Sequence, residues 1–122
     1  MVESVVIISD RSPIGINSAL EAIRIGSGFV ALGEIIECQI VYMGDAVYIL
    51  NKNADPEAIG LDSMAETLEM AELSDLELYV LDISLEDAGM TPDDLVEYES
   101  LKIINIEELT TMIEQAETCL RF

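Results

Sequence analysis

Two residues of this chain could act as nucleophiles, Cys38 and Cys119. A thiolate can carry sulfur or attack a substrate when its surroundings favour ionisation. Cys38 begins a predicted strand, at the edge away from the carboxyl ends where open α/β sheets bind their ligands. Cys119 lies inside a closing strand among apolar neighbours. Because buried cysteines usually behave as inert apolar residues, both stand as candidate nucleophiles whose expected role is packing.

The motifs of several common catalytic and binding sites are missing. The chain contains no histidine, which removes the commonest general base and excludes Ser-His-Asp, Cys-His and His-metal arrangements. The segment Ser12–Gly15 follows the first predicted strand, where a nucleotide loop would lie. It has one glycine and no lysine, so we expect a turn rather than a phosphate loop. No cofactor is predicted.

Three aspartates, Asp10, Asp45 and Asp82, each follow directly after a predicted strand. The carboxyl ends of parallel strands meet at one edge of a sheet, so these carboxylates could converge there. Converging carboxylates can hold Mg²⁺ or pair for acid–base chemistry. However, the chain has 25 acidic residues and aspartate is an ordinary turn residue. The three aspartates are therefore candidate metal ligands that ordinary turns would also explain.

The elements that must position these residues alternate between apolar runs and helical stretches. This pattern predicts a three-layer α/β/α fold with a mainly parallel, five-stranded sheet. After Asp82 we expect an acidic turn, and at Gly44 and Asp45 another turn. The predicted strands are Ser4–Ser9, Cys38–Met43, Leu78–Leu81, Leu101–Ile104 and Thr118–Phe122, and the predicted helices are Asn17–Leu32, Ser63–Ala71 and Glu107–Ala116, with Ser63 and Glu66 as a capping box.

The first predicted helix is apolar around most of its circumference. Its polar residues form one narrow stripe: Asn17, Glu21, Arg24 and Ser27. A helix on the surface of a monomer normally shows a wider polar face, so we expect this helix to lie at a subunit interface. Coverage by the sheet and a neighbouring helix of the same chain is the alternative. Gly26 and Gly28 inside the helix predict that another backbone packs closely there.

Length and composition predict a single domain over residues 1–122. Hydrophobic residues make up 51% of the sequence, which is enough for a packed core. No apolar run approaches the roughly 20 residues needed to span a membrane. The first strand follows the N-terminus with no basic segment before it, so no secretory signal is predicted and we expect a cytoplasmic protein.

The charge is strongly negative, with five Lys and Arg residues against 25 Asp and Glu residues, a formal net charge of −20. Nucleic-acid binding depends on basic residues that neutralise phosphates. We therefore expect no direct contact with nucleic acids or anionic membranes, and an RNA-directed role would need a basic partner. Adaptation to high intracellular salt would also explain this acidity.

Four segments, in order along nearly the whole chain, resemble the DsrE/DsrF family, and specifically its DsrF/TusC branch. The segment after the first strand is similar to that branch's loop and helix, including Pro13 and Gly15. The other three segments resemble its Asp-Gly-Val-Tyr region, its Ser-Leu-x-x-x-Gly-Leu stretch and its Leu-Arg-Phe ending, and they are Met43–Leu50, Asp82–Glu97 and Leu120–Phe122.

The resemblance implies a subunit of a cytoplasmic sulfur relay that serves tRNA thiolation or dissimilatory sulfur metabolism. Such assemblies are typically hexamers with two copies each of a DsrE/TusD-like, a DsrF/TusC-like and a DsrH/TusB-like protein. Active members carry a persulfide-bearing cysteine in the third strand, and the matching position here is Leu81. Leucine cannot carry sulfur, so the resemblance implies a non-catalytic partner subunit.

Two other interpretations stay open. The first is a stand-alone, homo-oligomeric sulfurtransferase that uses Cys38 or Cys119. The second is a homo-oligomeric module that binds a cation or small ligand at the edge formed by Asp10, Asp45 and Asp82. The first interpretation requires a thiol that reacts in the native protein, and the second requires that Mg²⁺ or Mn²⁺ stabilise the fold.

Overall fold

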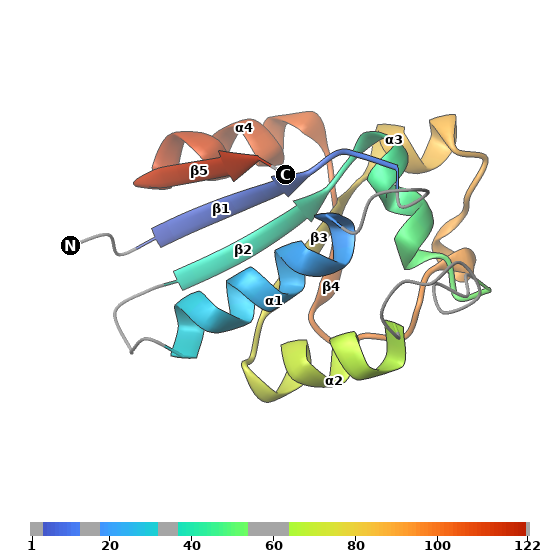
Figure 1. The fold of residues 1–122 in the computed structure, drawn as a ribbon. Coiled ribbons are helices and arrows are strands. Elements are labelled where there is room, and N and C mark those ends of the chain that lie inside the picture. The colour runs from blue at the N-terminus through green and yellow to red at the C-terminus, as the bar shows by residue number, and fades with distance from the viewer. Residues whose placement is uncertain (1–3, 13–17, 32–36, 54–63, 122) are drawn as a thin grey trace.

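The computed structural model describes residues 4–12, 18–31, 37–53 and 64–121. Five strands form one sheet in the order β4-β3-β2-β1-β5, and every neighbouring pair is parallel (Figure 1). The α/β fold with a parallel, five-stranded sheet is therefore confirmed. The strands are β1 (Ser4–Ser9), β2 (Glu37–Tyr42), β3 (Glu77–Leu81), β4 (Leu101–Ile104) and β5 (Thr118–Arg121).

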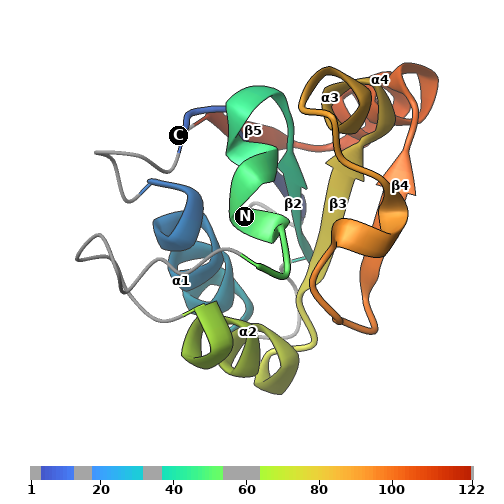
Figure 2. The same ribbon diagram turned by 90° about the vertical axis from the view of Figure 1, so that its right-hand side faces the viewer.

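Helices cover both faces of the sheet. The two ribbon views place α1 (Ser18–Ala31) and α2 (Met64–Leu73) on one face and α4 (Ile106–Gln115) on the opposite face (Figures 1 and 2). The remaining short elements are η1 (Gly44–Leu50), α3 (Asp82–Asp87) and η3 (Pro92–Asp94). In the described ranges, no helix has the length and apolar character that a membrane crossing would need.

The sheet separates two hydrophobic clusters, because successive residues of a strand point to opposite faces. In β1, Val5 and Ile7 belong to the larger cluster, and Val6 belongs to the smaller one. The larger cluster lies against α1, as Leu20 and Ile23 of that helix are part of it. The continuous β-branched run of β1 thus fits a strand buried on both faces.

Two predicted turns are helical in the structure. The turn expected after Asp82 is α3, and the turn expected at Gly44 is the start of η1. The apolar residues of η1 explain the second difference, because Ala46, Val47, Ile49 and Leu50 are all buried and join the larger cluster. A helical path brings these four side chains onto the core, which an open turn would not do.

The polar stripe and the close approach predicted for α1 are only partly found. Ser27 is buried rather than on a polar face. A Cβ on Gly26 would lie 3.0 Å from Cδ1 of Ile40 and 3.3 Å from Sγ of Cys38, so side chains of the sheet pack here rather than a backbone. Gly28 is exposed and a Cβ there would meet no atom within 4 Å, so the prediction for Gly28 is wrong.

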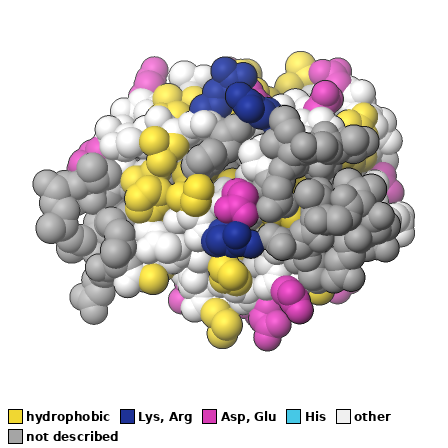
Figure 3. Space-filling model, in the orientation of Figure 1, with side chains coloured by type: hydrophobic (Ala, Val, Ile, Leu, Met, Phe, Trp, Pro, Cys, Tyr) yellow, Lys and Arg dark blue, Asp and Glu magenta, His cyan; other side chains and the backbone are white. Residues whose placement is uncertain are grey.

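The same chain covers much of the apolar surface of α1, through the sheet and α2. Ile25, Phe29 and Val30 remain only partly buried. Figure 3 has the orientation of Figure 1, in which α1 faces the viewer, and it shows hydrophobic side chains on this face of the molecule. Three predicted helix boundaries lie outside the described residues. They are the two ends of the first helix, Asn17 and Leu32, and the capping residue of the second, Ser63.

Candidate functional site

The carboxyl ends of β1 and β2 and the start of α3 are held together by backbone and side-chain hydrogen bonds. The amide of Met43 donates to the carbonyl of Ser9 at 3.0 Å, and the amide of Gly44 donates to Oγ of Ser84 at 2.9 Å. Gly44 has a φ of +56°, and a Cβ there would lie 3.1 Å from the carbonyl oxygen of Asp10. This combination requires glycine, so the loop after β2 is fixed against the end of β1.

Leu81 is the last residue of β3 and the position at which the resemblance implies a sulfur-carrying cysteine in active relatives. Its side chain is 2% exposed and belongs to the smaller cluster with Ile104 and Leu109. A buried hydrocarbon side chain supplies packing energy and no nucleophile. The end of β3 therefore has no thiol at this position.

The two cysteines lie on opposite faces of the sheet. In the parallel register Cys38 pairs with Val5, and Cys119 pairs with Val6. Val5 and Val6 are consecutive, so their side chains point to opposite faces, and each cysteine shares the face of its partner. The two thiols therefore cannot act together in one site.

The environments of the two cysteines also differ. Cys38 is buried in the larger cluster, and burial raises the pKa of its thiol to about 11. A thiol with such a pKa stays protonated and unreactive near neutral pH. Cys119 is exposed, contrary to the burial expected from its apolar neighbours in the sequence, because β5 is an edge strand of the sheet.

The three candidate aspartates lie at the carboxyl edge but do not form one site. Asp10 accepts from Nε of Arg121 at 2.9 Å, and Nη2 of Arg121 lies 2.8 Å from the same oxygen. Asp82 accepts from the amide of Ile83 at 2.6 Å, and Asp45 is exposed in the first turn of η1. Among the described residues, no three acidic or thiol side chains lie together in a way that could hold a metal ion.

Exposed apolar side chains near this edge were not singled out from the sequence. Ile83 and Ile106 each follow, by two positions, one member of the register pair formed by Leu81 and Ile104. Both are exposed large hydrophobic residues just beyond the ends of β3 and β4. The sequence offers no signal for them, because a local pattern of residues does not show which side of an isoleucine after a strand is covered by the rest of the fold.

The model of the DsrE/DsrF-like family matches residues 3–122, which is nearly the whole chain. The chain belongs to the DsrE/DsrF-like family. The resemblance drawn from the four sequence segments is thereby confirmed.

A curated relative supports the DsrF branch within the DsrE/DsrF-like family. The chain is 32% identical over 99 residues to the intracellular sulfur oxidation protein DsrF of Allochromatium vinosum. The matched region covers 79% of this chain and 68% of that protein. The similarity therefore extends across most of both sequences and is not limited to one motif.

Two solved structures share the fold at low sequence identity. The YchN protein of E. coli superimposes with a TM-score of 0.81 at 18% identity, covering 98% of this chain and 99% of that one. The protein MTH1491 of Methanobacterium thermoautotrophicum, described as of unknown function, gives a TM-score of 0.67 at 15% identity over all of both chains. These likenesses establish the fold of this DsrE/DsrF-like protein and carry no argument about its activity.

Proposed function

We propose that this chain is a non-catalytic, DsrF/TusC-like subunit of a cytoplasmic sulfur-relay complex. In this complex a DsrE/TusD-like subunit carries the sulfur as a persulfide, and a DsrH/TusB-like subunit completes the assembly. The observation that carries the proposal is the buried Leu81 at the end of β3, in a chain that belongs to the DsrE/DsrF-like family. The chain keeps the family's fold and has leucine at the position implied for the sulfur carrier.

The chemistry of sulfur transfer explains why this position matters. An acceptor thiolate attacks the terminal sulfur of a persulfide, so that one S–S bond forms while the other breaks and the donor leaves as a thiolate. Every carrier in such a chain of transfers therefore needs a thiol that ionises. Leu81 has none, and the high pKa of Cys38 keeps that thiol protonated. In this proposal the exposed Cys119 takes no part in the transfer, and the contribution of this chain is the surface it offers to its partners.

The surface of the chain fits a role beside other subunits. The partly buried Ile25, Phe29 and Val30 on α1 offer apolar area for a subunit contact. The net charge of −20 disfavours contact with RNA phosphates. If the relay serves tRNA thiolation, a basic partner must hold the tRNA, whereas dissimilatory sulfur metabolism makes no such demand.

Gentle purification of the tagged protein from its own host tests the proposal. Mass spectrometry should identify DsrE-like and DsrH-like chains in amounts equal to the tagged chain, and the native mass should correspond to two copies of each of three subunits. A particle that contains only this chain would contradict the proposal.

The exposure of Cys119 supports a second candidate function, a stand-alone homo-oligomeric sulfurtransferase that uses this thiol. The two functions differ in what the Cys119→Ser variant does. In the non-catalytic function, a relay complex that contains this variant transfers sulfur from a persulfide donor at the wild-type rate. In the second function, the isolated wild-type chain accepts labelled sulfur and the Cys119→Ser variant does not.

A further inference from the structure

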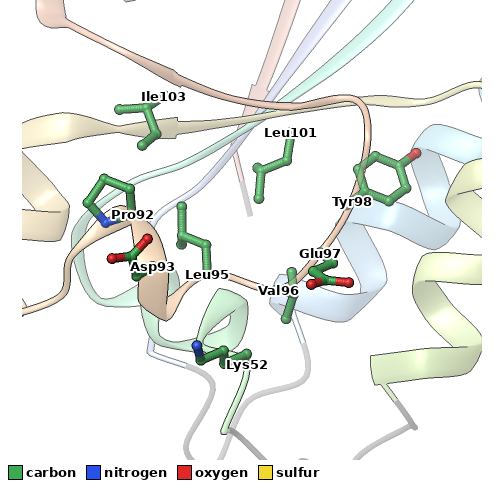
Figure 4. A pocket seen from close by; sticks show the side chains of 9 residues that line it. All are labelled: Lys52, Pro92, Asp93, Leu95, Val96, Glu97, Tyr98, Leu101 and Ile103. Carbon is green, nitrogen blue, oxygen red and sulfur yellow. The ribbon is translucent and has the colours of Figure 1, made fainter.

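The groove beside β4 and the region between the end of β1 and the start of α1 differ in how their polar groups are paired. The groove has a volume of about 670 Å³, and its lining mixes Leu95 and Leu101 with Asp93 and Glu97 (Figure 4). None of the described residues that line it has a buried side-chain polar atom without a hydrogen-bond partner. Three of the four described residues that do have such an atom lie around the end of β1 and the start of α1. The four residues are Ser9, Asp10, Ser18 and Ser27.

The carboxyl end of β1 lies where the direction of the sheet reverses. The strands β2, β3 and β4 follow one another on one side of β1, whereas β5 pairs with its other side. The connection from β1 to β2 contains α1, and the connection from β4 to β5 contains α4 on the opposite face (Figures 1 and 2). Open α/β sheets bind ligands in the crevice outside the carboxyl ends of the strands at such a reversal. The unpartnered atoms near the end of β1 therefore lie where this architecture places binding sites.

The side chain of Ser9 faces the first turn of α1. Ser9 is the last residue of β1, is fully buried and pairs with Tyr42 in the parallel register, so these two side chains share a face of the sheet. The hydroxyl of Tyr42 donates to the carbonyl of Ala19 at 2.9 Å, which places the first turn of α1 above this pair. Oγ of Ser9 has no hydrogen-bond partner among the described residues. A buried hydroxyl in this state weakens the fold unless a bound group satisfies it.

Ser18 and Arg11 add further hydrogen-bond donors around the same turn. Ser18 is the first residue of α1, where the backbone amides have no partners within the helix and the helix dipole favours an anion. Its Oγ is buried and, like that of Ser9, has no partner among the described residues. Arg11 follows Ser9 by two positions, is exposed, and forms no ion pair with another described residue.

The charge at the end of β1 is positive although the chain as a whole is acidic. Two of the five basic residues, Arg11 and Arg121, lie there. Nη2 of Arg121 lies 2.8 Å from Oδ2 of Asp10 and neutralises that carboxylate, so the charge of Arg11 is left over. Charges more than about 8 Å away are largely screened at physiological ionic strength. The acidic residues of the other elements therefore cancel little of this local positive charge.

We propose that a small tetrahedral oxyanion, of the size of sulfate, thiosulfate or phosphate, binds between Arg11 and the first turn of α1. The guanidinium of Arg11 and the free amides of the turn donate to its oxygens, and the hydroxyls of Ser9 and Ser18 complete its hydrogen bonds. A nucleotide does not fit this site, because the sequence after β1 lacks the repeated glycines and the lysine of a phosphate loop. The site consists of groups of this chain alone and does not depend on the proposed function.

Titration of the isolated, ¹⁵N-labelled chain with sodium thiosulfate and with sodium phosphate, at constant ionic strength, tests the site. The amide shifts of Ser18 and Ala19 should follow a saturable curve, and the two dissociation constants identify the preferred oxyanion. Shifts that do not saturate with either salt would overturn the site.

Ser9→Ala should raise the dissociation constant at least about tenfold, because a hydrogen bond to a charged group is lost. Its melting temperature without oxyanion should equal or exceed that of wild type, since the unpartnered hydroxyl is gone. Ser27→Ala is the matched control, because Ser27 is also buried with an unpartnered Oγ but lies nine residues, or about 14 Å, further along α1. It should leave the dissociation constant unchanged. Equal constants for folded Ser9→Ala and wild type would overturn the role of Ser9 and with it the site.

The arginines give a second matched pair. Arg11→Gln should also raise the dissociation constant at least about tenfold. Arg24→Gln removes the same charge from an exposed residue of α1 and should change the constant less than about twofold. Equal losses in the two variants would show only nonspecific attraction and would overturn the site. The relay function fails by a different result, namely that no DsrE-like or DsrH-like chain is recovered with the wild-type protein.

Discussion

The two faces of the sheet differ in how far their side chains are buried. On the α1 and α2 face, the larger cluster encloses Cys38 beneath Gly26. On the α4 face, a row of paired residues runs across the sheet from Cys119 through Val6 to Gln39 and Glu77. This row has exposed or polar residues at both ends, and only its centre is buried. The surroundings of each cysteine are therefore set by the face and the strand on which it lies.

The largest expected difference between the faces is in thiol reactivity. At pH 8 a thiol with a pKa of about 11 is ionised in about one molecule in a thousand, and Cys38 is also buried. We expect a disulfide reagent to modify Cys119 in the native protein at least about 100-fold faster than Cys38. The absorbance of the released thiolate gives the rate at which each thiol reacts in the native protein. The same measurement in guanidinium gives the total number of thiols. Rapid modification of two thiols in the native protein would contradict the comparison.

Serine substitutions of the two cysteines should change the free energy of unfolding by different amounts. Cys38→Ser places a hydroxyl in an apolar cluster, at a cost of about 1–3 kcal/mol in the free energy of unfolding. Cys119→Ser changes an exposed side chain and should stay within about 0.5 kcal/mol of wild type. Urea denaturation of both variants gives the two values. Equal losses would show that the faces do not differ as described.

Alanine substitutions at two glycines of α1 compare an open and a closely packed position of one helix, with a smaller expected effect on stability. Gly28→Ala should stabilise the protein by about 0.5–1 kcal/mol, because alanine favours a helix and the new methyl group meets no atom. Gly26→Ala has the same helix preference but crowds Ile40 and Cys38. It should therefore gain less than Gly28→Ala or lose stability. Equal gains in urea denaturation would mean that α1 is less closely packed on the sheet.

The smallest expected effect concerns the pKa of Glu77 on the α4 face. A hydrogen bond from Gln39 is the main cause that lowers this pKa, followed by one from Tyr79. A lowered pKa stabilises the fold above the unfolded-state pKa, and this contribution is lost as the pH falls through the folded-state pKa. Gln39→Ala should raise the pKa of Glu77, and Gln115→Ala, at the exposed end of α4, should not. Carboxyl NMR shifts measured across the acidic range give the pKa of Glu77 in each variant. An unchanged pKa in Gln39→Ala would mean that the hydrogen bond from Gln39 contributes nothing.

The strand pattern could be predicted closely from the sequence. The bounds of β1 and β4 agree with the prediction, β2 differs from it by one residue at each end, and β3 starts one residue earlier than predicted. The continuous β-branched run of β1 explains this success for that strand, since a strand buried on both faces is marked by its own residues. The helical start after Asp82 was missed, because the local composition is that of a turn.

The candidate site was predicted only in part. The absence of histidine and the leucine at position 81 follow from the sequence and already restrict the chemistry. The separate partners of Asp10 and Asp82 could not be predicted. Arg121 lies 111 positions from Asp10 in the sequence, and only the pairing of β5 with β1 brings them together.

The sequence alone determined the family, the alternation of strands and helices, and the lack of a nucleophile at the end of β3, because each of these depends on residue types at fixed positions. The tertiary structure decided which thiol is buried and which strands form the two edges of the sheet. Both depend on strand order, since Cys119 is exposed where β5 forms one edge of the sheet and Ile103 faces outward where β4 forms the other. Strand order is set by contacts between distant segments, and no local pattern of residues encodes it.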